Sequence, residues 1–500
     1  MSRKTLKTSF AINLLSPLAR IVVALVTIPI YIRHVGDARY GVISIMWVLL
    51  GYFGFLDLGL SRAATNALAK LQEAPQQERA RVLLTTFALN FGFGVVGAVV
   101  LFILGGFLLQ YVISIPDALR PEVAQSFPWI AALFPLALIS GVGFGALESR
   151  ERFLLTNMLQ VVGVSLTQIA PAVVAATVSP SLTVVIPTAV VAQVSSAVVA
   201  LTVVYRLEGP FSVRAFDRRE ARALLRYGSW ISVSNIISPL LASFDQFLIG
   251  SIMGVASVAH YAVPMSLVVR SQIFPAALAR TFFPRMSSSS PGEAGLLGAR
   301  ALSSLGYGYA AVCAAAIILS PAFFRYWIGG DFALLAAPVA QILFLGAWIN
   351  GLAFVPFTLI QSQGRPDITG KLHMIEIVPF LLILWGLTST LGINGTAIAW
   401  SVRCTTDALA LFWMSGIPRR DVLSALRPGA LLVASEVATR FAGSELGLAL
   451  SAAVTVGLIG IGFAYAYSDD WRQLIDAQLI ARARRFSGSL IQRLRPSGSP

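Results

Sequence analysis

Residues 9–32 read SFAINLLSPLARIVVALVTIPIYI and form the first long apolar stretch of the chain. A helix that crosses a bilayer needs about 20 apolar residues, so this stretch is long enough to do so. Arg20 nevertheless lies near its middle. A charge at that depth costs about 2.5–3.5 kcal/mol on insertion scales, so Arg20 is expected to face protein or water and not lipid.

The composition of the 500 residues is also that of a membrane protein. Hydrophobic residues make up 56% of the chain and charged residues only 12%, against about 25% charged in soluble domains. The net charge of +14 fits arginine-rich cytoplasmic loops, which hold membrane proteins in orientation, and predicts no nucleic-acid partner. The two cysteines, Cys313 and Cys404, are far apart and form no disulfide framework or metal motif.

Fourteen apolar stretches predict an all-α, polytopic membrane protein. They are residues 9–32, 40–61, 82–110, 128–148, 153–178, 182–205, 228–252, 257–279, 301–324, 334–361, 370–390, 393–415, 429–442 and 446–467. The thirteenth is short and contains Glu436 and Arg440. These two could pair one helical turn apart, or the stretch could be an interfacial segment.

The distribution of basic residues predicts the orientation. With the N-terminus in the cytoplasm, 29 of the 37 lysines and arginines fall in cytoplasmic segments and five in outer loops. This asymmetry predicts an even number of spans with both termini cytoplasmic. It fits twelve spans as well as fourteen.

A short repeat predicts two halves. Residues 13–18, NLLSPL, return 222 residues later as NIISPL at 235–240, and each copy opens a set of six predicted spans. Six is even, so the copies have the same orientation and predict two parallel six-helix lobes around a central cavity. A kink made twice by Ser and Pro is the structural alternative.

The predicted organisation has five parts. They are an N-terminal lobe (1–205), a basic cytoplasmic linker (206–227), a C-terminal lobe (228–415), two further spans (416–467) and a cytoplasmic tail (468–500). The linker could alternatively bind anionic lipid headgroups.

Polar residues on the repeated helices predict a lined cavity. Asn13, Ser16 and Arg20 fall on one face of the first helix, and Asn235 and Ser238 take the corresponding positions in the repeat. A helix surrounded by lipid would not gather polar groups in this way.

Three arginines lie near the middle of predicted spans, and they favour an anionic cargo. They are Arg20, Arg270 and Arg403. The planar guanidinium fork suits phosphate oxygens, so a phosphate or diphosphate headgroup is the expected ligand. Asp407 lies four residues after Arg403, so that pair could be a structural ion pair or part of the site.

Four acidic residues within spans are candidates for ion coupling: Asp57, Asp245, Glu376 and Asp407. Asp57 lies near the inner end of its span and could instead cap a helix. Glu376 follows His373 by three residues, so the two could form a proton relay or simply face a neighbouring helix.

Other motifs exclude several function classes. Residues 364–371, GRPDITGK, resemble a nucleotide-binding loop but have one residue too many between the glycines and no following Ser or Thr. The three scattered histidines predict no metal site. We therefore expect no cofactor, no bound metal and no enzymatic activity.

The stretch IPIYIRHVGDARYGVISIMWVLLGYFGFLDLGLSRA, residues 28–63, resembles the polysaccharide transporter family of the multidrug/oligosaccharidyl-lipid/polysaccharide flippase superfamily. The resemblance implies a flippase that moves a polyprenyl-diphosphate-linked oligosaccharide across the bacterial inner membrane by alternating access. It implies that Arg20 and Arg270 line a cationic cavity for the diphosphate, with Arg403 as a further candidate.

The resemblance also implies membrane lipids, a polysaccharide polymerase and glycosyltransferases as partners, in O-antigen, capsule or exopolysaccharide export. Two alternatives stay open from the sequence. One is a drug or cation antiporter on the same fold, and the other is a non-transporting membrane scaffold for glycosyltransferases.

Overall fold

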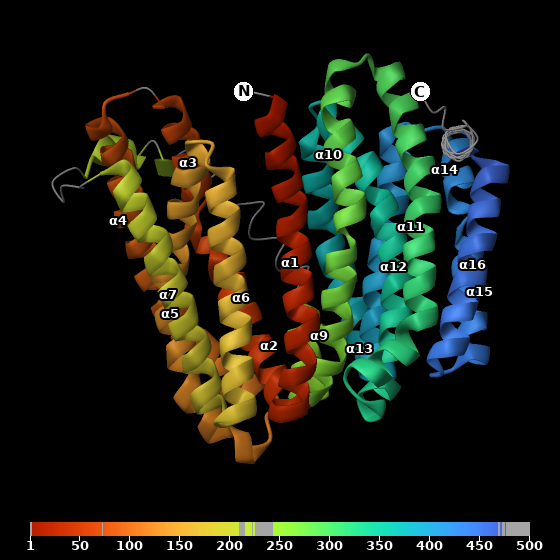
Figure 1. Ribbon diagram of the computed structural model, residues 1–500, viewed down its shortest axis with the longest axis horizontal. Coiled ribbons are helices and arrows are strands. Elements are labelled where there is room, and N and C mark those ends of the chain that lie inside the picture. Colours follow the sequence, from red (N-terminus) through yellow and green to blue (C-terminus); the bar gives the residue numbers. More distant parts are fainter. Residues whose placement is uncertain are drawn as a thin grey trace, which may run out of the picture. The chain divides into compact units, whose positions relative to one another are not determined.

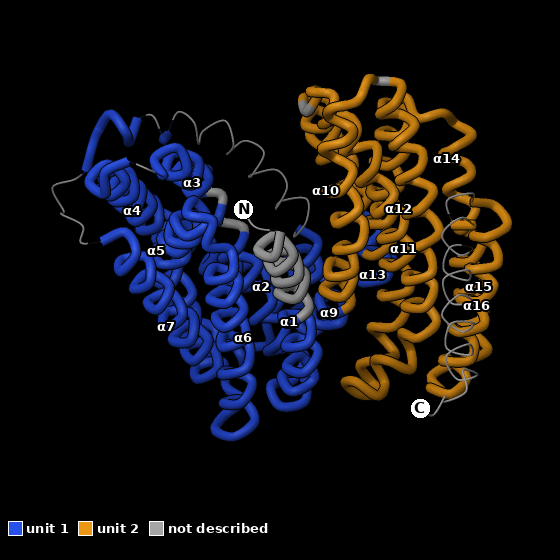
Figure 2. The backbone as a smooth tube through the Cα atoms, turned by 45° about the horizontal axis from the view of Figure 1, so that its top comes forward, with its two compact units in different colours: residues 1–263, 385–396 blue, residues 264–384, 397–500 orange. Residues whose placement is uncertain are grey.

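The structure is a computed structural model and is all-helical in the residues that it describes (Figure 1). These are residues 3–72, 74–209, 216–222, 224–225, 244–468, 471–472 and 476, with no side chain described for 3–18, 52–53, 55, 291 and 366. The chain divides into two compact units (Figure 2). Unit 1 comprises residues 1–263 and 385–396, and unit 2 comprises residues 264–384 and 397–500.

Unit 1 is a helical bundle. Its helices are α1 (Arg3–Val35), α2 (Asp37–Tyr52), α3 (Leu60–Lys70), α4 (Gln76–Val100), α5 (Arg120–Ser149), α6 (Phe153–Thr177) and α7 (Leu182–Glu208). Short 3-10 helices cover Phe53–Asp57 and Asp117–Leu119, and π-helical turns cover Leu101–Gly105 and Leu108–Val112. The unit also includes the start of α9 (Val255–Ser271) and residues 385–396 of α13 (Pro366–Ser415).

Unit 2 is also a helical bundle. Besides the rest of α9 and α13, it contains α10 (Ile273–Ser288), α11 (Pro291–Trp327), α12 (Gly330–Ser362), α14 (Arg419–Leu426), α15 (Gly429–Ala442) and α16 (Leu446–Tyr467). Helix α11 begins with a capping box, in which the Glu293 carboxylate accepts the backbone N–H of Ser290 at 3.1 Å. Trp348 of α12 donates to the Gly306 carbonyl at 3.0 Å, which fixes α12 against α11.

Small side chains let the helices approach closely, as is usual in membrane bundles. A fully buried cluster joins α3, α4, α5 and α7 and consists of Ala64, Leu68, Val82, Leu83, Val142, Ala146, Leu147 and Val204. Helix α2 meets the start of α9 at Gly41, where an added Cβ would lie 1.7 Å from the carbonyl oxygen of Val255. Only glycine permits that contact.

Ten helical stretches in the described residues are long and apolar enough to span a membrane. They are Gln76–Val112, Asp117–Ser149, Phe153–Thr177, Leu182–Glu208, Val255–Ser288, Gly292–Trp327, Gly330–Ser362, Asp367–Ser415, Arg419–Ala442 and Leu446–Tyr467. The fold class is therefore a polytopic helical membrane protein. Fourteen spans and two parallel lobes stay predictions, because the predicted span 228–252 lies largely outside the described residues.

One predicted span is interrupted in the structure, and the predicted boundary between two others coincides with a break. The predicted span 40–61 is not one helix: α2 ends at Tyr52, and Leu58 and Gly59 adopt positive φ angles of 48° and 67° before α3 begins. The predicted spans 370–390 and 393–415 correspond to the two parts of α13, which is broken between them at Gly392 (φ 63°, ψ −144°). That backbone conformation is open essentially only to glycine.

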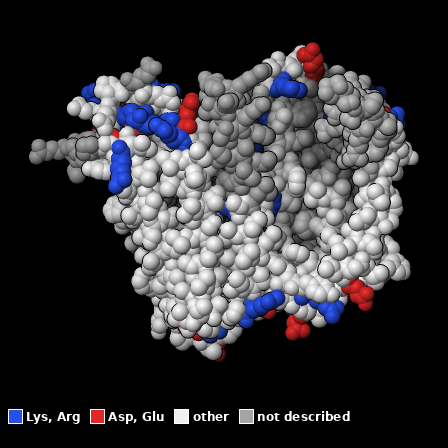
Figure 3. All heavy atoms as spheres, viewed as in Figure 1, with Lys and Arg blue, Asp and Glu red and all other residues white. Residues whose placement is uncertain are grey.

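Charged side chains gather near the helix ends. On the face drawn in Figure 3, most of the wide surface between the ends of each bundle is uncharged. Many large apolar side chains are exposed on both units, among them Val96, Phe102, Ile103 and Trp385 of unit 1 and Leu334 and Trp413 of unit 2. This is the surface expected of helices that face hydrocarbon.

Candidate substrate and ion-coupling sites

The two arginines expected to hold a diphosphate lie within long helices. Arg20 is in the middle of α1 and Arg270 is near the end of α9, and both side chains are partly exposed. Nη1 of Arg270 donates to the carbonyl of Ser266, one turn earlier, at 2.8 Å. Arg20 belongs to unit 1 and Arg270 to unit 2, so their joint use as one site is a proposal.

The four predicted polar cavity residues fall where the structure gives no side chains. Asn13 and Ser16 are in α1, whose first residues have no described side chain, and Asn235 and Ser238 lie outside the described residues. Their role stays a prediction.

Four of the singled-out residues form one charged cluster in unit 2. The two parts of α13 lie side by side, so His373 and Glu376 of the first part meet Asp407 of the second. Nε2 of His373 is 3.7 Å from Oδ1 of Asp407, and Glu376 is close enough to Asp407 for the two carboxyl groups to interact. The Arg403 guanidinium lies over the ring of Phe380, 5.3 Å from its centroid.

In the acidic pair of this cluster, Asp407 is buried and Glu376 is half-buried. Both side-chain oxygens of Glu376, and Oδ1 of Asp407, accept no hydrogen bond from the described residues. Two neighbouring buried carboxyl groups repel each other when both are charged, so a proton or a cation between them stabilises the pair. Arg403 supplies a positive charge that offsets part of this repulsion, and the part of the cluster in ion coupling stays a prediction.

Asp57 has a capping geometry. Its Oδ1 accepts from the Ser61 hydroxyl at 2.6 Å and from the Ser61 backbone N–H at 3.2 Å, at the first turn of α3. A carboxylate in this position satisfies a helix N-terminus. Its part in ion coupling stays a prediction.

Asp245 is tied to a tyrosine within unit 1. It is buried, and its Oδ2 accepts a hydrogen bond from the Tyr261 hydroxyl at 2.6 Å. The neighbouring His260 reaches α2, where its Nε2 is 3.1 Å from Oδ2 of Asp37. Asp245 thus lies in a polar region that joins the start of α9 to helical residues 244–252. Ion coupling at Asp245 also stays a prediction.

One buried charged cluster is not predicted from the sequence. Glu208, the last residue of α7, accepts two hydrogen bonds from Arg79 of α4 and two from Arg150, which follows α5. Arg79 also donates to the carbonyl of Leu68 in α3 at 2.6 Å. From the sequence, both arginines count only as loop charges. No spacing rule links them to a carboxylate so far along the chain.

The fold and these intramembrane charges define a class, that of polytopic membrane transport proteins with charged residues inside the helix bundles. The chain belongs to the polysaccharide biosynthesis protein family, whose model matches residues 6–290. The family expected from residues 28–63 is therefore confirmed.

A curated relative covers most of the chain. It is a Shigella flexneri protein described as a "Putative O-antigen transporter", 29% identical over 389 residues, or 76% of this chain and 91% of the relative.

Solved structures share the fold. The lipid II flippase MurJ, in an inward closed conformation, matches with a TM-score of 0.73 at 12% identity, over 93% of this chain and all of that one. The Vibrio cholerae MATE transporter VcmN matches with a TM-score of 0.56 at 16% identity, over 84% of this chain and 97% of that one. At these identities the likeness shows the fold alone.

Proposed function

We propose that this protein is a flippase that moves a polyprenyl-diphosphate-linked oligosaccharide from the cytoplasmic to the outer leaflet of the bacterial inner membrane. Membership of the polysaccharide biosynthesis family and the relative described as an O-antigen transporter support the cargo class. The fold shared with the lipid II flippase MurJ supports movement of a lipid-linked sugar by alternating access.

The observation that carries the proposal is the pair of arginines within apolar helices. Arg20 lies mid-way along α1 and Arg270 within α9. An arginine in the hydrocarbon region is costly unless it serves a ligand or a partner group. In the proposed flippase the two guanidinium groups hold the diphosphate from opposite lobes of a central cavity, and Arg403 of the α13 cluster is a further contact.

The membrane orientation and the partners of the protein are also part of the proposal. Fourteen spans are an even number, so both termini lie on the same side of the membrane. The basic residues predict that this side is the cytoplasm. The glycosyltransferases that build the cargo and a polymerase that consumes it are the expected partners.

The direction of transport is proposed to come from ion movement through Glu376 and Asp407. The observation that supports this is their mutual proximity in a partly buried cluster with His373. Asp57 and Asp245 have hydrogen-bonding partners that give them structural roles, so they rank behind the α13 pair.

The test uses the native host with this gene deleted and replaced by the Arg20→Ala, Arg270→Ala double variant. The measurement is the amount of polysaccharide exported to the cell surface. Each lost charged hydrogen bond is worth about 1.5–3 kcal/mol, so we expect surface polysaccharide to fall at least about tenfold. Arg280→Ala and Arg285→Ala, at exposed positions of α10, are matched controls and should export normally.

Wild-type export from a stably expressed double variant would overturn the assignment. Binding of organic cations by the purified protein, in place of the lipid diphosphate, would indicate the antiporter alternative. Reconstituted protein that moves no lipid under any ion gradient would indicate the scaffold.

A further inference from the structure

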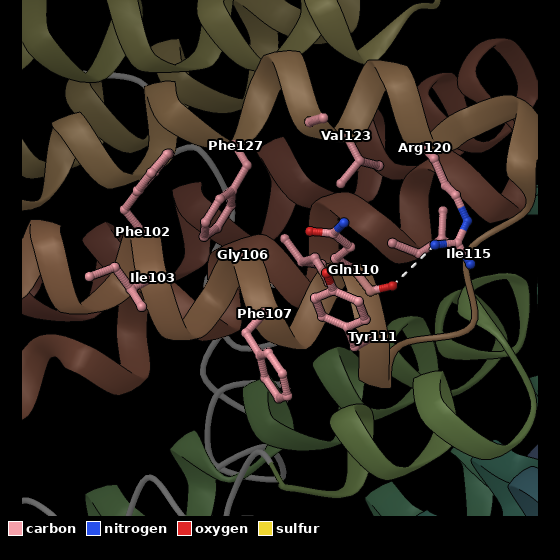
Figure 4. A pocket seen from close by; sticks show the side chains of 12 residues that line it. Phe102, Ile103, Gly106, Phe107, Gln110, Tyr111, Ile115, Arg120, Val123 and Phe127 are labelled. Carbon is pink, nitrogen blue, oxygen red and sulfur yellow. Dashed lines mark hydrogen bonds between the residues drawn. The ribbon is translucent and has the colours of Figure 1, made fainter.

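A groove of about 620 Å³ lies on unit 1, between the helical residues 101–112 that continue α4 and the start of α5. Figure 4 shows Phe102 beside Phe127, whose ring centroid is 6.5 Å away, and Phe107 beside Tyr111, at 5.2 Å. Its walls are mostly apolar or aromatic. The volume is within the range of about 300–1,000 Å³ that small-molecule sites occupy.

The groove is a consequence of irregular helix geometry. Helix α4 continues into two π-helical turns, Leu101–Gly105 and Leu108–Val112, with Gly106 between them. π-helical turns are rare and occur often at functional sites. A Cβ at Gly106 would still lie 3.9 Å from the Phe127 ring, so the absent side chain leaves open space on the groove floor.

The groove opens on an apolar surface of the kind that faces lipid. Phe102, Phe107 and Tyr111 are each more than half exposed, and the span Gln76–Val112 that carries them is apolar enough to cross a membrane. Tyrosine is enriched at membrane–water interfaces. The position of Tyr111 therefore favours the level of the lipid headgroups for this end of the groove.

Two opposite charges lie at the headgroup end. Arg120 is the one charged residue among those that line the groove. Its Nη1 donates to the Gln110 carbonyl at 3.1 Å (Figure 4), and its Nε donates to Asp117 Oδ1 at 3.0 Å. The Asp117 side chain is 97% exposed. The mouth thus presents a guanidinium and a carboxylate side by side to the headgroup region.

We propose that this groove binds a resident phospholipid with a phosphoethanolamine headgroup. One acyl chain lies along Phe102, Phe107 and Phe127, the phosphate accepts from Arg120, and the ammonium donates to Asp117. Each buried methylene contributes about 0.8 kcal/mol. A lipid diphosphate is a poorer match, because its several negative charges would meet a single guanidinium that is already shared with a carboxylate.

The proposal does not depend on the transport activity, and its test measures binding. Full-length protein in detergent is titrated with dioleoylphosphatidylethanolamine and, separately, with dioleoylphosphatidylglycerol, with bound lipid counted by native mass spectrometry. The expected result is tighter binding of the ethanolamine lipid. Gly106→Leu, which fills the groove, should weaken it at least tenfold, and Arg120→Gln should weaken both lipids.

Asp117→Asn keeps the test independent of folding, because this exposed side chain supports no packing. It should remove the preference for ethanolamine over glycerol while glycerol-lipid binding is kept or improved. Arg325→Gln, at the end of α11 in unit 2, is the matched arginine control and should change nothing. Equal binding of the ethanolamine lipid by wild type and Gly106→Leu, or tighter binding of undecaprenyl diphosphate than of either phospholipid at this groove, would overturn the proposal.

Discussion

Arg79 donates to both carboxylate oxygens of Glu208, at 2.7 Å from Nη2 and 3.0 Å from Nε, although 129 residues separate the two in sequence. Both side chains are buried, with 1% and 2% of their surface exposed. Arg150 donates to the same two carboxylate oxygens, at 2.5 Å from Nε and 2.9 Å from Nη2. A single acidic residue therefore joins the ends of α4, α5 and α7.

Glu208→Gln should destabilise the protein. It leaves two guanidinium groups, one of them fully buried, without a negative partner, and breaking a buried pair costs about 3–5 kcal/mol. We expect a clearly lower thermal unfolding midpoint in detergent. Glu151→Gln, an exposed neighbour of Arg150, is the control. Equal midpoints for Glu208→Gln and wild type would show that the cluster contributes nothing to stability.

Gly41→Ala tests the contact between α2 and α9. The new methyl group would overlap the Val255 carbonyl oxygen, and forcing helices apart costs about 1–3 kcal/mol. We expect reduced yield of folded protein and a lower unfolding midpoint. Gly51→Ala on the same helix, where nothing lies within 4 Å of the added Cβ, should be neutral or slightly stabilising. If the two variants behave alike, the close approach is not needed for folding.

Gly392→Ala tests the break in α13. An L-residue at φ 63° and ψ −144° is strained by about 1–3 kcal/mol, so the variant should unfold at lower temperature. The matched control is Gly386→Ala, a helical position in open space. A Gly392→Ala protein with wild-type stability would mean that the two parts of α13 can join without this turn.

The acidic pair of α13 predicts a coupling phenotype. Glu376→Gln and Asp407→Asn each remove a site for a proton or cation, and one charge fewer per cycle loses about 2.3 kcal/mol of driving free energy per 100 mV. Flipping in proteoliposomes should therefore lose its dependence on an imposed ion gradient or membrane potential.

The control for this pair is Asp367→Asn, an exposed acid in the same helix that pairs with Lys371 at 3.2 Å. It should retain the full response. An unchanged gradient dependence in the Glu376→Gln, Asp407→Asn double variant would remove α13 from the coupling mechanism.

The sequence pattern alone predicts a polytopic helical membrane protein and many of the helix boundaries. The predicted span 446–467 coincides with α16, and the predicted start of the sixth span at 182 is the first residue of α7. Hydropathy works well here because a bilayer requires long, continuous apolar stretches. It fails at 53–59, where a 3-10 turn and two left-handed residues interrupt an apolar run without changing its hydropathy.

The candidate sites are also predictable only in part from the sequence. The charges inside the spans, such as Arg20 and Glu376, are visible in the sequence because they interrupt apolar runs. The partners are not visible, because His373 meets Asp407 only after α13 folds back at Gly392. Pairing within one helix follows from spacing, whereas pairing between helices depends on which faces pack together.

The cluster around Glu208 also sets an order of events during synthesis. Arg79 and Arg150 leave the ribosome before their shared carboxylate exists, so in the proposed orientation they enter the membrane surface as unneutralised charges that keep their loops in the cytoplasm. Only when α7 is complete does Glu208 arrive to bind both. In that orientation the same two side chains act first as topology signals during insertion and later as ion-pair partners, and the contacts that join α4, α5 and α7 form only after α7 has been made.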